Sequence, residues 1–134
     1  MPAPHRDPRL VALVAAGGTV GVLARDLLTR AVGATSWPMA TFAINLVGAF
    51  TLGLLLASLR RRGPDAGRLL HARLLLGTGV LGGFTTYSAL AVGTVELAQD
   101  DRLVAALAYG VGTVVLGLGA VALGTAAGRS RTTA

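Results

Sequence analysis

The segment Gly82–Ser88, with the sequence GGFTTYS, combines residue types that could bind an ion inside a membrane. It lies within an apolar run, Leu74 to Ala98, that is long enough to cross a bilayer. Paired glycines followed by paired threonines are poor helix formers and supply hydroxyl groups instead of packing bulk. Because backbone that leaves a helix in lipid must find new hydrogen-bond partners, a break here is a candidate ion or substrate site. The alternative is a continuous helix whose glycines pack against a neighbour and whose threonines bond to the preceding turn.

Asn45 is a second candidate, because it is the sole asparagine of the chain and falls in the middle of another apolar run. Burying its amide costs on the order of a few kcal/mol unless the group finds hydrogen-bond partners. Hydrogen bonds between helices are the simplest way to supply them. Thr41 lies one helical turn earlier and therefore shares a face with Asn45.

The composition indicates a membrane protein. Of the 134 residues, 53% are hydrophobic and 13% are charged, and the mean hydropathy is +0.67. Too few polar side chains exist to coat a soluble domain, so we expect an integral membrane protein. The absence of cysteine excludes disulfides and thiolate metal sites. The net charge of +6 comes from arginines clustered between the apolar runs, which indicates contact with the lipid bilayer and not with nucleic acid.

Four apolar segments are each near the length of roughly 20 residues that a bilayer core requires. They cover residues 10–32, 39–59, 74–98 and 103–127. The connections between them are too short to fold separately, so residues 1–134 are expected to form a single all-α membrane domain. Ser36 is the expected N-cap of the second span, with Pro38 in its first turn.

Pairs of glycines four residues apart recur in the spans. At this spacing both glycines lie on one helix face, where they let two backbones approach closely. The pattern predicts a tightly packed bundle and an interface with another subunit, since four helices leave little interior for a pathway. The pairs are Gly17 with Gly21, Gly79 with Gly83, and Gly124 with Gly128.

Arginines are distributed unequally between the two sides of the predicted bundle. An even number of spans places both termini and the 60–73 loop on one side, and this side carries nine arginines against three on the other. By the positive-inside rule, both termini face the cytoplasm of a cell membrane that the chain crosses four times. The three are Arg25, Arg30 and Arg102; the nine are Arg6, Arg9, Arg60, Arg61, Arg62, Arg68, Arg73, Arg129 and Arg131.

Several motifs occur in order along nearly the whole chain. They are Gly17-Gly18-x-x-Gly21-x-x-x-Arg25, Pro38-x-x-Thr41-x-x-x-Asn45-x-x-Gly48, the Gly82–Ser88 segment and, as a looser match, Tyr109-x-x-x-Thr113. Together they resemble the Fluc/CrcB family of fluoride channels. The resemblance implies a four-span chain with a break in the third span, an antiparallel dimer with two fluoride pores, and passive export of fluoride from the cytoplasm.

The resemblance also implies a structural sodium ion at the centre of the dimer. In the family, the first glycine and the first threonine of the third-span motif offer carbonyl oxygens to it, and these positions are Gly82 and Thr85 here. Two copies supply four oxygens, which suits a hard cation. The alternative is an unwound turn whose freed groups are satisfied by water.

The family's fluoride pore is lined by uncharged donors and ring edges. Fluoride is small and strongly hydrated, so a selective pore must replace its water without trapping the ion. The resemblance makes the amide of Asn45 an N–H donor to the anion. The other implied positions are Thr41, Ser88 and Thr113 as hydroxyl donors, Tyr87 as a ring edge, and Arg25 in the vestibule.

The sequence departs from the family pattern at four positions. Two phenylalanines usually line the pore, and Tyr87 and Leu90 stand at their positions; leucine has no ring edge to offer an anion. Ala89 replaces a usual hydroxyl residue, and Gly93 stands where a glutamate is common. Some family members are heterodimers of two related chains with opposite, fixed orientations. The departures and the arginine bias favour one half of a heterodimer over a homodimer.

Three functions compete on the sequence alone. The first is a passive fluoride channel, and the second is a non-conducting accessory subunit of such a channel, which Leu90 favours. The third is a small proton-coupled exporter, which needs a carboxylate near the bilayer midplane, whereas the acidic residues here lie at span ends. No nucleophile–base pair, HExxH motif, P-loop or paired carboxylate is present, so the chain is not expected to be an enzyme.

Overall fold

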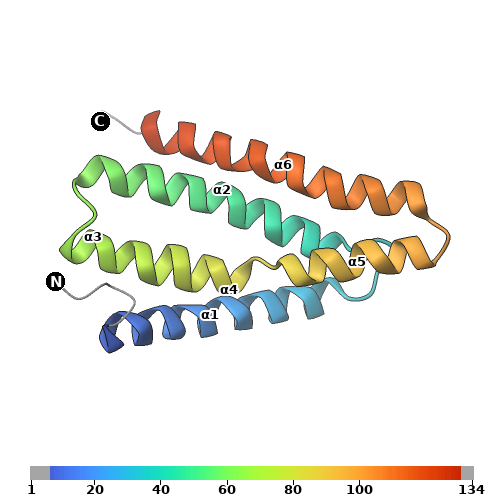
Figure 1. Cartoon of the computed structure of the whole chain (residues 1–134), viewed down its shortest axis with the longest axis horizontal. Helices are drawn as coiled ribbons and strands as arrows, with labels where there is room; N and C mark the ends of the chain where they lie inside the picture. The colour runs from blue at the N-terminus through green and yellow to red at the C-terminus, as the bar shows by residue number, and fades with distance from the viewer. Residues whose placement is uncertain (1–6, 131–134) are drawn as a thin grey trace.

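The computed structural model describes residues 7–130, and every regular element in this range is a helix (Figure 1). Four helical stretches are long and apolar enough to cross a membrane, which confirms the predicted all-α, four-span fold. The third stretch, Gly67–Gln99, is divided into several parts. The elements are α1 (Pro8–Val32), α2 (Met39–Arg62), α3 (Gly67–Ala72), η2 (Arg73–Leu81), α4 (Gly82–Phe84), α5 (Tyr87–Gln99) and α6 (Leu103–Ser130).

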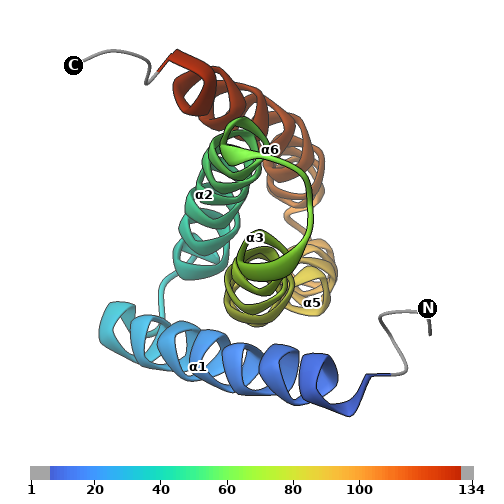
Figure 2. The same cartoon turned by 90° about the vertical axis from the view of Figure 1, so that its left-hand side faces the viewer.

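Successive spans run in opposite directions. The start of α1, the end of α6 and the connection from α2 to α3 lie at one end of the molecule, and the other two connections lie at the opposite end (Figure 1). Seen end-on, α2 packs beside α6, whereas α1 lies across the third span (Figure 2). Most of the described arginines therefore lie at one end of the fold, whereas Arg25 lies near the break in the third stretch; Arg6 and Arg131 lie outside the described residues.

Glycines bring the spans close together, as their spacing predicted. A Cβ atom added at Gly124 would collide with the Phe50 carbonyl of α2, and one added at Gly83 would collide with the Gly18 carbonyl of α1. Close approach of two helix backbones requires such residues, because any side chain would hold the helices apart. The glycine pairs thus pack within a single subunit, between α2 and α6 and between α1 and the third span.

Few side chains are buried inside this chain. The largest buried group lies between α5 and α6, where Tyr109 packs with Leu90, Leu97 and Ala106. Trp37 completes this cluster, with its ring centroid 5.2 Å from that of Tyr109 in an edge-on arrangement. Much of the apolar surface of all four helical stretches is exposed, which fits a multi-pass membrane protein.

The ends of the spans are fixed by polar contacts that only partly follow the predictions. The α2 helix begins at Met39 with Pro38 at its N-cap, so the prediction that Ser36 caps it was wrong. The Ser36 carbonyl instead accepts a 2.5 Å hydrogen bond from Arg102 Nη1, across the two connections at that end. The third helical stretch begins at Gly67, before the apolar run that starts at Leu74, because α3 includes the charged Arg68.

Candidate functional site

The third span is broken at its two threonines. Thr85 and Thr86 have extended backbone, with ψ angles of 156° and 122°, between the end of α4 and the start of α5. The Thr86 hydroxyl accepts a 3.2 Å hydrogen bond from the Ala89 amide, and this caps α5. The Thr85 hydroxyl donates to the Leu81 carbonyl at 2.9 Å. The predicted break is confirmed. The hydrogen bond from a threonine hydroxyl to the preceding turn, which the alternative of a continuous helix predicted, also forms, at Thr85.

The paired glycines do not make the break. Gly82 has helical backbone, with φ −64° and ψ −37°, and both glycines belong to α4. Gly83 serves the contact with α1 described above, where there is no room for a side chain. The conformational freedom of glycine is therefore not what makes the break, which lies immediately after this short helix.

Asn45 closes the break from the side of α2. Its Nδ2 donates to the Thr86 carbonyl at 3.0 Å, and its Oδ1 accepts from the Thr86 amide at 2.8 Å. In a continuous helix the Thr86 amide would instead donate to the Gly82 carbonyl, four residues earlier. The Asn45 side chain thus satisfies the freed backbone and leaves the Gly82 carbonyl without its usual donor. A carboxamide has two N–H groups, so this arrangement uses one and leaves the second.

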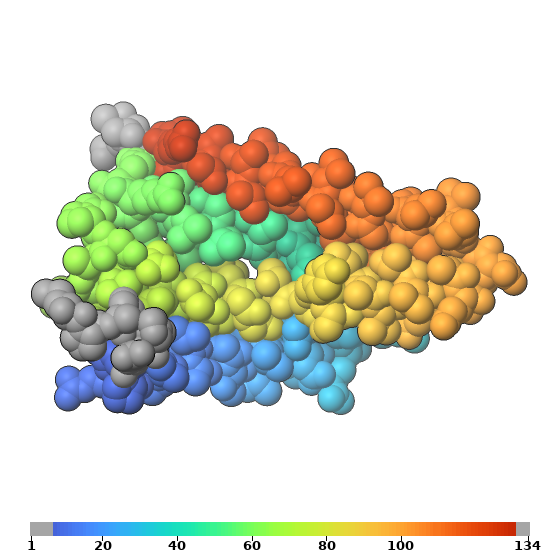
Figure 3. Space-filling view, viewed as in Figure 1, coloured from blue at the N-terminus to red at the C-terminus, as the bar shows by residue number. Residues whose placement is uncertain are grey.

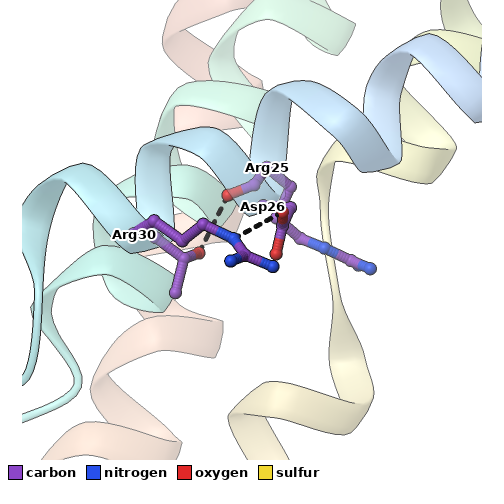
Figure 4. Close-up of polar contacts among 4 residues, drawn as sticks. Arg25, Asp26 and Arg30 are labelled. Atoms are coloured by element: carbon purple, nitrogen blue, oxygen red, sulfur yellow. Dashed lines mark hydrogen bonds and ion pairs between the residues drawn. The ribbon is translucent and has the colours of Figure 1, made fainter.

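Two further residues position Thr85. A Cβ atom added at Gly48 of α2 would collide with the Thr85 methyl group, so glycine is needed for the methyl to fit there. From the side of α1, Arg25 Nη1 lies 3.5 Å from the Thr85 carbonyl. Figure 4 shows the Arg25 side chain reaching toward the extended segment, away from the exposed Asp26–Arg30 ion pair at 2.7 Å. The predicted vestibule arginine therefore contacts the break itself.

A cleft of about 380 Å³ opens beside the break, between α2, the third span and α6. In the space-filling view a gap is open between α2 and the third span in this region (Figure 3). Most of its wall is apolar, so the few polar groups stand out. The cleft brings together five of the predicted site residues, namely Asn45, Gly82, Thr85, Tyr87 and Thr113. Thr41, Ser88 and Arg25 are not part of its lining.

The α6 side of the site contains a buried tyrosine. The Tyr109 side chain is 0% exposed, and its hydroxyl forms no hydrogen bond with any residue in the described range, although Thr41 is a polar neighbour. Thr113, 4% exposed, lies one turn later and donates to the Tyr109 carbonyl at 2.6 Å. Sequence reasoning gave Tyr109 no role of its own, although its spacing from Thr113 already placed both residues on one helix face.

The two positions expected to carry aromatic rings have opposite environments. Tyr87 is 82% exposed at the start of α5, while Leu90 is 8% exposed and packs against Tyr109. The hydroxyl of Ser88 is also exposed and lies 3.1 Å from that of Thr86. Within the described residues, then, the Tyr87 side chain is left largely uncovered, whereas Leu90 packs against Tyr109 and also lines the cleft.

Gly93 is also explained by this packing. A Cβ atom added there would lie 3.2 Å from Pro38 Cγ and 3.2 Å from Tyr109 Cε1. A glutamate, noted above as common in the family at this position, would have to displace one of these two rings. The glycine and the buried tyrosine therefore fit each other.

Comparisons with known proteins match most of the chain. The sequence model described as CrcB-like protein, Camphor Resistance (CrcB), matches residues 12–125. The fluoride-specific ion channel FluC 2 of Leifsonia xyli is 46% identical and covers 95% of this chain and 91% of that protein. FluC 1 of the same organism is 41% identical over 87% and 85% of the two chains. FluC 1 of Cutibacterium acnes is 45% identical over 84% and 80%.

Proposed function

The chain belongs to the CrcB-like family, and we propose that it is a subunit of a fluoride-selective membrane channel and not an enzyme. The observation that carries this proposal is that three relatives named fluoride-specific ion channels are 41–46% identical over most of both chains. The four apolar spans and the polar cleft at the break agree with it. In this function fluoride moves down its gradient out of the cytoplasm.

The cleft supports the proposal because its polar groups are uncharged. The second N–H group of Asn45, the Thr113 hydroxyl and the ring edge of Tyr87 all belong to residues that line it. Such groups bind an anion that has shed its water without holding it permanently. Thr113 would have to turn its hydroxyl away from the Tyr109 carbonyl to donate to fluoride. Thr41 and Ser88 would extend this track beyond the cleft.

We further propose that this chain pairs with a second four-span subunit of opposite orientation. Support comes from Leifsonia xyli, where FluC 1 and FluC 2 are two related chains in one organism. The arginine bias supports one orientation with both termini in the cytoplasm. Cysteines introduced by Ala66→Cys and Asp100→Cys, at opposite ends, should then react from opposite sides of the membrane. Labelling of each from both sides would contradict a fixed orientation.

A sodium ion at the dimer centre would use the carbonyls of Gly82 and Thr85. Both residues line the cleft, and the Gly82 carbonyl has lost its usual donor to Asn45. Arg25 approaches the Thr85 carbonyl at 3.5 Å, a long contact that leaves the oxygen free to accept another partner. Bound sodium would hold two subunits together through these oxygens. A dimer that is equally stable in sodium and in N-methylglucamine would count against this proposal.

The accessory-subunit alternative depends on Leu90. A leucine buried against Tyr109 gives the anion no ring edge, so a pore that uses this position would conduct weakly. Leu90→Phe should raise fluoride flux if the pore on this subunit conducts. Overpacking could cost roughly 1–3 kcal/mol, so assembly is checked first by size-exclusion chromatography. A well-assembled variant that conducts no better than the parent would favour the accessory role.

Fluoride efflux from liposomes tests the proposed function. The chain is reconstituted alone and with a related four-span chain from the same genome, and released fluoride is measured with an ion-selective electrode. We expect fluoride efflux, with chloride efflux at background, from at least one of the two preparations. Equal release of both anions, or none in either assembled preparation, would overturn the proposal.

A further inference from the structure

A second hollow lies at the arginine-rich end of the molecule, where α2 is followed by α3. Its volume is about 450 Å³, within the range of roughly 300–1,000 Å³ that is usual for small-molecule sites. It shares no lining residue with the cleft at the break. One wall is apolar, formed by Leu56, Leu59 and Leu69, and the rest includes two arginines and one aspartate. The hollow therefore joins an apolar wall to a charged rim.

The charged rim is positive overall. Arg73 Nε donates to both carboxylate oxygens of Asp65, at 3.0 and 2.9 Å, so the negative charge of Asp65 is already balanced. Arg60 forms no hydrogen bond or ion pair with any residue in the described range. It therefore adds a positive charge that nothing in this part of the chain neutralises, and an anion is the complementary ligand.

The three consecutive arginines at the end of α2 have different surroundings. Arg61 Nη1 donates to the carbonyls of Gly128 and Arg129, at 2.8 and 3.1 Å, and so caps the end of α6. Arg60 and Arg62 are both exposed, but only Arg60 lines the hollow. Their shared chemistry and separate positions make Arg62 a matched control for Arg60.

The position of the hollow along the membrane span favours a lipid over a free anion. Leu56 and Leu59 belong to the last apolar turns of a membrane span, and Arg60 follows at once. This order places leucines at the level of acyl chains and arginine at the level of headgroups. We propose that the hollow binds an anionic phospholipid, with its phosphate against Arg60 and one acyl chain along the leucine wall. A basic pocket between helices at the cytoplasmic surface suits such a headgroup.

Native mass spectrometry of the purified protein tests this proposal without any measurement of fluoride. The probes are dioleoylphosphatidylglycerol and dioleoylphosphatidylcholine, and the readout is the ratio of the two lipids retained. We expect the parent to prefer the glycerol lipid and Arg60→Gln to lower that preference about fivefold, the worth of one arginine near a membrane surface. Arg62→Gln should change it less than twofold. Arg60→Lys should lie between parent and Arg60→Gln, because it keeps a charge but loses the planar fork.

Three results would overturn the proposal. Equal losses from Arg60→Gln and Arg62→Gln would show only general surface charge. Equal retention of both lipids by the parent would show an apolar groove without headgroup recognition. Displacement of the glycerol lipid by inorganic phosphate alone would show a small-anion site. If Arg60→Gln does not fold, as judged by size-exclusion chromatography, the parent's lipid ratio and Arg60→Lys still decide the question.

Discussion

The contact between α2 and α6 and the break in the third span both bring two helices together, but they depend on different groups. In the first, Gly53 and Gly124 let two helices touch through their backbones, and both helices continue unbroken through the contact. In the second, the chain leaves the helix at Thr85 and Thr86, and a side chain from another span replaces the lost backbone partner. The difference shows that glycine lets helix backbones approach each other, whereas the break depends on the side chain of Asn45.

The largest expected effect comes from disturbing the glycine contact. Gly124→Val should prevent folding, because even a Cβ atom at this position would collide with the Phe50 carbonyl. Gly119→Val is the matched control on the same helix, since a Cβ atom there meets nothing within 4 Å in the subunit. Yield of monodisperse protein on size-exclusion chromatography measures both. Similar yields for the two variants would show that α2 and α6 do not need this contact.

A smaller effect is expected at the break. Asn45→Ala removes both hydrogen bonds to Thr86, so the backbone amide and carbonyl of Thr86 lose their partners in largely apolar surroundings. We expect a loss of about 1–3 kcal/mol in the free energy of unfolding, the usual cost of leaving a polar group without its partner; Thr86 is part-buried. Thermal unfolding in detergent measures it, with Thr51→Ala on the exposed face of α2 as the control. An unchanged midpoint would mean that water replaces the amide.

The smallest expected effect concerns the packing of Gly48 against the Thr85 methyl group, as distinct from the hydrogen bond of the Thr85 hydroxyl. Gly48→Ala should cost about 1 kcal/mol, because its new methyl group meets that of Thr85, which has limited room to move. Thr85→Ser removes that methyl and keeps the hydroxyl that bonds to Leu81. The double variant should therefore recover most of the lost stability in a double-mutant cycle. Additive losses would show that the two residues do not interact.

Much of the fold followed from the sequence because its signals are local. Apolar runs of sufficient length identify spans whatever they pack against, and glycines four residues apart identify close contacts. The start of the third helix at Gly67 did not follow from the apolar run, which begins at Leu74, because Arg68 and Arg73 lower the hydropathy of the first turns. The position of the break was also predicted, and of the two residue pairs given as its cause the threonines form it, whereas the glycines are helical.

The site was less predictable because its contacts are distant in sequence. Asn45 and Thr86 are 41 residues apart, and nothing in either segment shows that they pair. The burial of Leu90 likewise depends on Tyr109 in the next span, which a pattern within α5 does not contain. The proposed role of Asn45 as a fluoride donor stays a prediction, and the structure adds that the same amide has a structural role.

Fluoride efflux through Asn45→Asp tests the central proposal, that fluoride passes the broken span against this amide. Aspartate can still accept from the Thr86 amide, but its carboxylate opposes an anion in surroundings of low dielectric. The equivalent residue of the partner subunit is changed as well, and assembly is confirmed by size-exclusion chromatography before liposomes are made. We predict fluoride efflux at the background of protein-free liposomes. Undiminished efflux through a fully assembled channel would contradict the account and leave Asn45 with its structural role alone.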